Sequence, residues 1–297
     1  MTAIPTDFHF SQASLQDFTD CQRRFQLRYL QQLAWPALQA EPVLENEQRL
    51  SLGGAFHRLA QQYLVGVEAA RLGKMAVGQG ASSDLPRWWE NFLRYALPLA
   101  GLPLAGVANA GRLERVLAVE QVLSAPFQGY RLIAKYDAVF RLERPEGARF
   151  AIFDWKTSRT RPKRSWLAER LQTRVYPYLL AEAGGFLNHG QPIPPGQIEM
   201  IYWFTEYPEQ PERFTYDADQ HRQDGVILSG LVTEIESLPD EQFELTPHEE
   251  RCAFCTYRSL CERGVQAGRL ETMPAEQEAV DDFGLSFDFD QIAEVEF

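Results

Sequence analysis

Three runs of strand-forming residues follow one another in the middle of the chain, and they constrain its fold more than any other feature. They span residues 113–123, 130–142 and 149–157 and are rich in Val, Ile, Phe and Tyr. Between the last two runs, the sequence ERPEG at residues 143–147 has the composition of a turn, so we expect these two runs to form a hairpin. A three-stranded meander is therefore predicted over residues 113–157.

Helical patterns lie on both sides of this meander. Apolar residues at helical spacing predict helices before it, at residues 11–31 with Ser11 as N-cap, about 53–68 and about 85–97. A loop with several Pro and Gly residues is expected at 97–111. After the meander we expect a helix at about 165–183, strands at 197–205 and 213–216, and a helix at 219–238. This order predicts an α/β domain with a mixed central sheet flanked by helices.

The charge of the chain is unevenly distributed. The net charge is −12, which by itself argues against a nucleic-acid partner. Nine acidic residues and no Lys or Arg follow Arg269, however, so the body of the chain is only mildly acidic. Such a body can still carry a local basic groove. We expect residues 269–297 to form a disordered or loosely docked tail; the alternative is a brake that imitates the charge of DNA.

The sequence lacks two features that would direct the protein to a membrane or out of the cell. No run of 18 or more apolar residues occurs, and the N-terminus lacks the basic and apolar segments of a signal peptide. We therefore expect a cytoplasmic protein that does not span a membrane.

Two acidic residues and a lysine mark a candidate reactive centre. Asp154 and Lys156 lie two residues apart at the end of an apolar strand and so face the same side. Counting back from the turn places Asp137, on the preceding strand, at about the same level. Two neighbouring carboxylates repel unless a hard cation lies between them. That cation would hold water and a phosphate, while Lys156 would stabilise charge or help to activate the water. The alternative is an ordinary surface pattern, since D-x-K is common by chance.

Three other residues are candidates for the same centre. His57 lies near the start of a predicted helix, behind Gly53 and Gly54, and a neutral imidazole can complete a metal shell. A lone His in such a position is more often structural. Gln172 and Tyr176 are four residues apart and share one face of the next predicted helix.

Six basic residues follow the candidate centre closely. They suit binding to a phosphate backbone, whereas the alternative is a solvated entry to the helix. These residues are Arg159, Arg161, Lys163, Arg164, Arg170 and Arg174.

The chain has four cysteines, three of them within ten residues of one another. Disulfides are improbable in a cytoplasmic protein. Cys252, Cys255 and Cys261 can offer three thiolates to one centre, and Cys21 would complete a set of four that joins the first helix to the last segment. By count, four thiolates fit zinc or a [4Fe–4S] cluster equally well.

Together these motifs resemble the RecB-type branch of the PD-(D/E)XK nuclease superfamily. The resemblance covers about residues 10–262 and rests on six motifs, in order: F-S-Q-A-S-L-x-x-F-x-x-C at Phe10–Cys21, G-x-x-x-H at Gly53–His57, Asp137, D-W-K at Asp154–Lys156, Q-x-x-x-Y at Gln172–Tyr176, and C-x-x-C-x-x-x-x-x-C at Cys252–Cys261. Two departures are Trp155, where the family usually has a smaller residue, and Gln22, where it often has Pro.

The resemblance implies a restriction-endonuclease-like core over residues 1–268, with a helical portion at about 60–111. It implies Mg or Mn bound by His57, Asp137, Asp154 and the backbone carbonyl of Trp155. Lys156 would be the catalytic lysine, with Gln172 and Tyr176 positioning the site or the DNA. It favours a [4Fe–4S] cluster over zinc at the cysteines, as in CRISPR-associated and AddB-like members.

The function expected from this resemblance is a metal-dependent DNA nuclease. We expect an exonuclease on single-stranded or flapped DNA in repair, recombination or CRISPR adaptation, with a helicase or another repair or CRISPR protein as partner. One alternative is a catalytically silent DNA-binding module of a larger nuclease–helicase complex. The presence of His57, Asp137, Asp154 and Lys156 together favours the enzyme. A zinc-stapled protein without a nucleic-acid role is disfavoured by the basic stretch.

Overall fold

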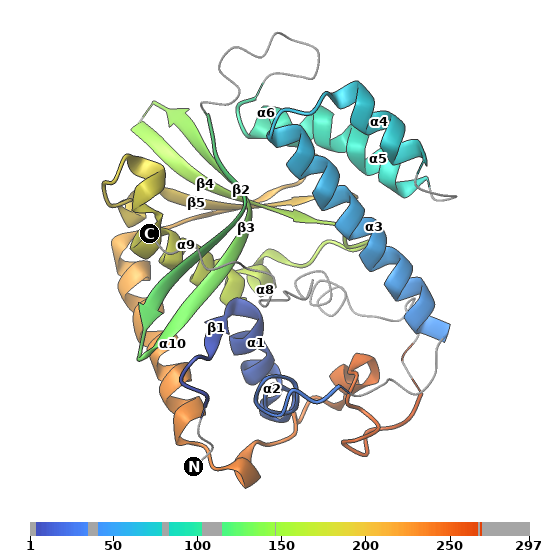
Figure 1. The fold of residues 1–297 in the computed structure, drawn as a ribbon, viewed down its shortest axis with the longest axis vertical. Helices are drawn as coiled ribbons and strands as arrows, with labels where there is room; N and C mark the ends of the chain where they lie inside the picture. Colours follow the sequence, from blue (N-terminus) through green and yellow to red (C-terminus); the bar gives the residue numbers. More distant parts are fainter. Residues whose placement is uncertain are drawn as a thin grey trace.

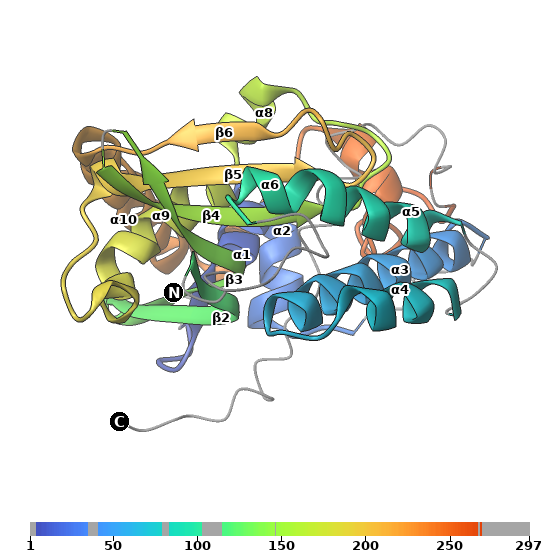
Figure 2. The same cartoon turned by 90° about the horizontal axis from the view of Figure 1, so that it is seen from above.

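The computed structural model describes residues 4–34, 41–78, 83–102, 115–145, 147–266 and 268, with only the backbone for 41–48, 50, 143 and 144. The expected tail at 269–297 lies outside the described residues, and so does most of the expected loop at 97–111. Within the described part, the chain forms a mixed sheet between two layers of helices (Figures 1 and 2).

The sheet has six strands and both kinds of pairing. They are β1 (His9–Ser11), β2 (Val116–Phe127), β3 (Tyr130–Arg144), β4 (Gly147–Lys156), β5 (Ile198–Phe204) and β6 (Glu212–Thr215). Their order is β1-β3-β4-β5-β6, and β2 pairs with β3 beside this path. β1 with β3 and β4 with β5 are parallel, whereas the other pairs are antiparallel. The predicted meander and the mixed sheet are thereby confirmed.

Helices cover the two faces of the sheet and enclose two separate apolar cores. On one face lie α1 (Gln12–Asp20), α9 (Leu171–Ala183) and α10 (Ala218–Ser237), around a core that includes Leu15, Val175 and Leu228. On the other face lie α3 (Glu41–Leu64), α4 (Ala69–Gly78), α5 (Asp84–Asn91) and α6 (Leu97–Leu99), as Figure 1 shows. The second core is rich in aromatic residues and includes Phe56, Trp88 and Trp203.

Two predicted helices are each broken by a contact with a distant part of the chain. The helix expected at 11–31 begins with Ser11 as N-cap but stops at Cys21, whose backbone is extended. The following Arg23 N–H donates to the carbonyl of Glu244 at 2.9 Å, a bond made across the fold. The helix expected at 165–183 is broken at Arg170, and Leu171 N–H donates to the side chain of Gln16 at 3.0 Å.

Several element boundaries also differ from those expected. α3 begins earlier than predicted, while β1 and α4 were not predicted at all. The remaining short elements are α2 (Gln22–Phe25), η1 (Gln26–Leu30), η2 (Phe92–Ala96), α8 (Arg164–Glu169), η3 (Gly184–Asn188), η4 (Pro195–Gln197), η5 (Asp240–Gln242) and η6 (Glu249–Phe254).

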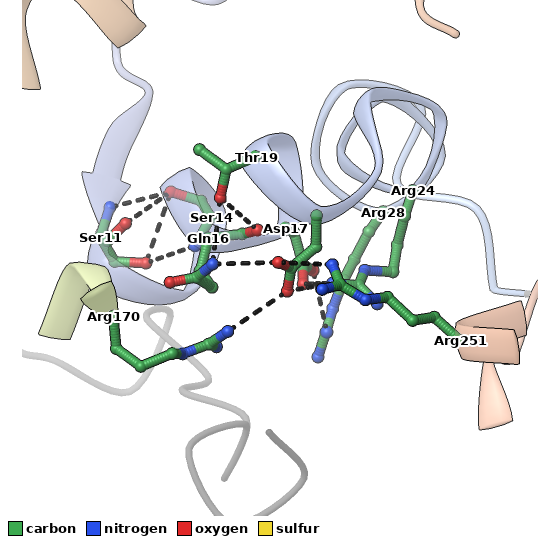
Figure 3. A network of polar contacts seen from close by, with 10 residues as sticks. Ser11, Ser14, Gln16, Asp17, Thr19, Arg24, Arg28, Arg170 and Arg251 are labelled. Atoms are coloured by element: carbon green, nitrogen blue, oxygen red, sulfur yellow. Dashed lines mark hydrogen bonds and ion pairs between the residues drawn. The ribbon is translucent and has the colours of Figure 1, made fainter. Parts of the chain in front are cut away.

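Ion pairs and hydrogen bonds join the N-terminal helices to the segment that carries three of the cysteines. Asp20 lies 3.2 Å from Arg251 and 3.5 Å from Arg170, in the network of Figure 3. The Tyr257 hydroxyl donates to the carbonyl of Leu33 at 3.0 Å. These two ends of the domain are therefore held together by groups of the chain itself.

We expected four clustered cysteines to join the two ends of the domain, and the structure does not show such a cluster. Among the described residues, no three cysteine sulfurs lie within 4.8 Å of one another. Four thiolates on one zinc ion, at about 2.3 Å each in a tetrahedron, would have to approach to about 3.8 Å. The charged network around Asp20 closes the domain here, so a tight thiolate cluster is not needed for the two ends to meet.

Candidate functional site

The candidate site lies where β3 changes its partner strand. On one side, β3 pairs with β1 at residues 131–133 and then with β4 from Ala138 onward. The apolar residues of β3 also change core at this step: Tyr136 packs in the first core, and Ala138, two residues later, packs in the second. Alternate residues of a regular strand would face the same side. Asp137 lies at this irregular step.

Asp137 is fixed by two donors from different elements. Its Oδ1 lies 3.2 Å from Nδ1 of His57 on α3, and its Oδ2 accepts the backbone N–H of Trp155 on β4 at 2.8 Å. Burial opposes ionisation of this carboxyl, but His57 and the Trp155 N–H outweigh it, so the pKa of Asp137 is lowered. Asp137 is therefore a carboxylate at neutral pH.

Asp154 is opposite Asp137 and is held by other groups. Pairing of Ala138 with Phe153 puts Asp137 at the level of Asp154, as counting from the turn predicts. Lys156 Nζ lies 2.7 Å from Oδ2 of Asp154, and Gln172 Nε2 donates to its Oδ1 at 2.6 Å. Burial raises the pKa of Asp154 to about 6, and the negative charge of Asp137 adds to this shift against the opposing effect of Lys156.

Tyr176 completes this side of the site. It is buried beside Gln172 on α9, and burial raises the pKa of its phenol well above the ordinary value. Its backbone carbonyl accepts a hydrogen bond from the hydroxyl of Tyr136 at 2.8 Å, which fixes α9 against β3. Gln172 and Tyr176 therefore both lie on α9, and the side chain of Gln172 is directed at Asp154.

A glycine explains how His57 reaches the sheet. A Cβ on Gly53 would lie 2.9 Å from Oγ1 of Thr157, just after the end of β4. Only a residue without a side chain lets α3 approach β4 this closely. His57 lies one helical turn further on and thus points at Asp137.

Glu120 is a member of the site that the sequence analysis missed. The ligand atoms of His57, Glu120 and Asp137 all lie within 4.8 Å of one another. This is the group of three potential metal ligands found in the described part of the chain. Burial raises the pKa of Glu120, as does the negative charge of Asp137. A signal was present, because Glu120 interrupts the apolar run of β2 just as Asp137 interrupts that of β3.

The expected metal ligands are only partly brought together. His57 and Asp137 meet, whereas the Asp154 carboxylate faces Lys156 and Gln172 and is not in the group with Glu120. Trp155 contributes its backbone N–H to Asp137, and its indole is buried in the second core. The carboxylates match the oxygen ligands that Mg²⁺ or Mn²⁺ accept, and the imidazole adds a nitrogen ligand of the kind that transition metals accept.

The six basic residues after β4 differ in their surroundings. Several of them contact carboxylates of the described residues: Arg161 and Arg164 pair with Glu212, Arg170 with Asp20, and Arg174 with Asp224. Arg159, Lys163 and Arg164 are exposed. The carboxylate partners compete with phosphate for the guanidinium groups, so the exposed residues have the easiest access to a backbone.

The four cysteines lie in the described part of the chain and carry free thiols. Burial raises the pKa of Cys252 to about 11, and the negative charges of Cys255, Cys21 and Cys261 add to this shift. Burial likewise raises the pKa of Cys255 and Cys261. Cys21, from the other end of the domain, thus contributes to the raised pKa of Cys252, but no three of the described cysteine sulfurs lie within 4.8 Å of one another.

Comparison with known proteins identifies the family. The model of the PD-(D/E)XK nuclease superfamily matches residues 9–262, and the chain belongs to this superfamily. No curated protein matches the sequence significantly.

Among solved structures, a protein from Eubacterium rectale that is provisionally named an exonuclease has 10% sequence identity and a TM-score of 0.42. The match covers 78% of this chain and 84% of that one.

No helix among the described residues is long and apolar enough to cross a membrane.

Proposed function

We propose that this chain is a divalent-metal-dependent deoxyribonuclease that hydrolyses phosphodiester bonds at the site of Asp137, Asp154 and Lys156. The observation that carries the proposal is the convergence of His57, Glu120 and Asp137 within 4.8 Å, beside the buried pair of Asp154 and Lys156. Membership of the superfamily supports a nuclease, and Mg²⁺ or Mn²⁺ fits the imidazole and carboxylate donors.

Each residue of the site has a proposed role. By their positions, His57, Glu120 and Asp137 would hold the cation. The family resemblance adds Asp154 and the backbone carbonyl of Trp155 to this ligand set. A bound divalent cation supplies charge for the phosphate oxygens and lowers the pKa of a bound water. Gln172 orients the carboxylate of Asp154 through its hydrogen bond of 2.6 Å. Tyr176 supports Gln172 from the buried side.

Lys156 is placed to act on the substrate. Its ammonium lies 2.7 Å from Asp154 and can stabilise negative charge on the phosphate as water attacks phosphorus. In the reaction the bond from phosphorus to the leaving sugar oxygen breaks, and a proton from the water passes to that oxygen. No other reactant is needed.

The DNA would approach over the basic stretch that follows β4. We propose Arg159, Lys163 and Arg164 as first phosphate contacts because they are exposed. At Arg161, Arg164, Arg170 and Arg174 a phosphate would exchange with the carboxylate partner. Single-stranded or flapped DNA with free ends is the proposed substrate. Substitution of Lys163 by Ala should lower the salt dependence of DNA binding by about one phosphate contact.

A [4Fe–4S] cluster on Cys21, Cys252, Cys255 and Cys261 remains our proposal for the thiols. The family resemblance supports this proposal, and the charge of Cys21 contributes to the raised pKa of Cys252 although the two residues come from opposite ends of the domain. Among the described residues, no three cysteine sulfurs lie within 4.8 Å of one another, whereas a single zinc ion would require a closer approach. A cluster of several irons and sulfides is larger and separates its ligands further. Visible absorption in anaerobically purified protein would support it, whereas a colourless protein with stoichiometric zinc would refute it.

The nuclease proposal is tested by two substitutions with matched controls. Lys156→Ala and Asp154→Ala should abolish Mn²⁺-dependent degradation of single-stranded DNA. Lys74→Ala and Asp219→Ala make the same chemical changes at exposed positions and should leave it intact. Circular dichroism of each variant checks the fold. Full activity of both site variants would refute the site, and wild-type DNA binding without any cleavage would favour the binding-module alternative.

A further inference from the structure

Glu120 has an unusual backbone for a residue within a strand. Its φ is +50°, in the left-handed region, which is unfavourable for an L-residue. Its neighbours pair regularly with β3, Val119 with Ala138 and Gln121 with Tyr136. Glu120 therefore lies opposite Asp137, between two paired residues. Its backbone has a conformation that the rest of β2 does not share. Such strain persists where the surrounding structure fixes it, often at functional sites.

The two carboxylate oxygens of Glu120 face different partners. Oε1 lies 4.0 Å from Nδ1 of His57, while Oε2 forms an ion pair with Nζ of Lys135. Lys135 precedes Asp137 by two residues on β3 and pairs with Val122 of β2, so it lies diagonally across from Glu120. The Lys135 side chain is 32% exposed and that of Glu120 is 15% exposed, so the lysine is the member nearer to solvent.

Each carboxylate of the site already has a partner within the chain itself. Asp137 faces His57, Asp154 faces Lys156, and Glu120 faces Lys135. A divalent cation at His57 and Asp137 would be repelled by an ammonium held beside it. Glu120 cannot give both oxygens to such a cation while it remains paired with Lys135.

We propose that Lys135 is a counter-ion that competes with the divalent cation for Glu120, so that binding transfers this carboxylate from the lysine to the metal. The inference rests on the proposed metal-dependent function and adds a positioning residue to it. Lys135 then limits how tightly the site holds its cation. Its longer and more exposed side chain can move into solvent when the cation binds, whereas Glu120 stays fixed by its strand.

The test is calorimetric titration of the metal-free chain of 297 residues with MnCl₂ at neutral pH. Lys135→Met should tighten Mn²⁺ binding about tenfold, and Glu120→Gln should weaken it about tenfold. Arg131→Met is the matched control, because Arg131 carries the same charge on the same strand, four residues or roughly 13 Å away, and donates to Ser124. It should change the affinity by less than about twofold.

The double variant separates competition from simple repulsion. If Lys135 acts through Glu120, Lys135→Met should tighten binding much less in the Glu120→Gln background than in the wild type. Equal gains in both backgrounds, or no gain in the wild-type background, would overturn the inference. If Lys135→Met does not fold, as judged by circular dichroism, Lys135→Gln serves in its place. A wild-type chain that binds no Mn²⁺ would instead refute the metal-dependent function itself.

Discussion

Asp154 should make the stability of the metal-free protein depend on pH in an unusual direction. Its pKa is raised to about 6 in the folded state, against about 3.9 for an exposed Asp. The folded protein thus binds this proton more tightly than the unfolded chain. The stability that results is present below about pH 4 and is lost as the pH rises through about 6. Most acid-sensitive carboxylates behave in the opposite way.

The size of the effect follows from these pKa values. Between about pH 7 and about pH 4.5, the carboxyl of Asp154 should add about 2 kcal/mol to the free energy of unfolding. Because Asp154 is only 4% exposed, solvent screening reduces this value little. Other groups titrate in the same range, so the quantity to measure is the difference between wild type and Asp154→Asn.

Urea unfolding of both proteins across this pH range gives the difference directly. Loss of the Asp154 partner of Lys156 destabilises the variant by an amount that stays constant where the lysine stays charged. The wild type should therefore gain about 2 kcal/mol relative to Asp154→Asn as the pH falls to about 4.5. A difference that is flat with pH, or that moves in the other direction, would refute the raised pKa.

Three further variants test how the site and the domain are held. Gly53→Ala would place a Cβ 2.9 Å from Oγ1 of Thr157. It should therefore lower the free energy of unfolding in urea by about 1–3 kcal/mol and weaken Mn²⁺ binding. Unchanged values would contradict the close approach of α3 to β4. Asp20→Asn removes one partner from three arginines and should lower the free energy of unfolding by about 3 kcal/mol. The control Asp219→Asn, in an exposed pair, should change it by less than about 0.5 kcal/mol. Equal effects of the two variants would argue against the network. Ser11→Ala removes the capping bond to α1 and should lower the thermal midpoint in a calorimetric scan, corresponding to about 1 kcal/mol, and an unchanged midpoint would show that the cap contributes nothing.

The strands of the meander could be predicted because their evidence is local. Runs of Val, Ile and Phe and the turn at 143–147 determine β3, β4 and their register, and the register alone puts Asp137 level with Asp154. The helix breaks at Cys21 and Arg170 could not be predicted in this way. Each is stabilised by a partner more than 100 residues away, Glu244 in one case and Gln16 in the other.

The sequence by itself determined most of the chemical groups of the site, but not Glu120. It placed His57, Asp137, Asp154 and Lys156 on elements whose periodicity and turns are local properties, and it gave the superfamily through their order. Only the tertiary structure decided how these groups are arranged. The left-handed backbone of Glu120 and the ion pair with Lys135 depend on how β2 and β3 pair. The charged network around Asp20 likewise depends on three segments that meet only in the folded chain, because ion pairs across the fold leave no periodic trace in the sequence.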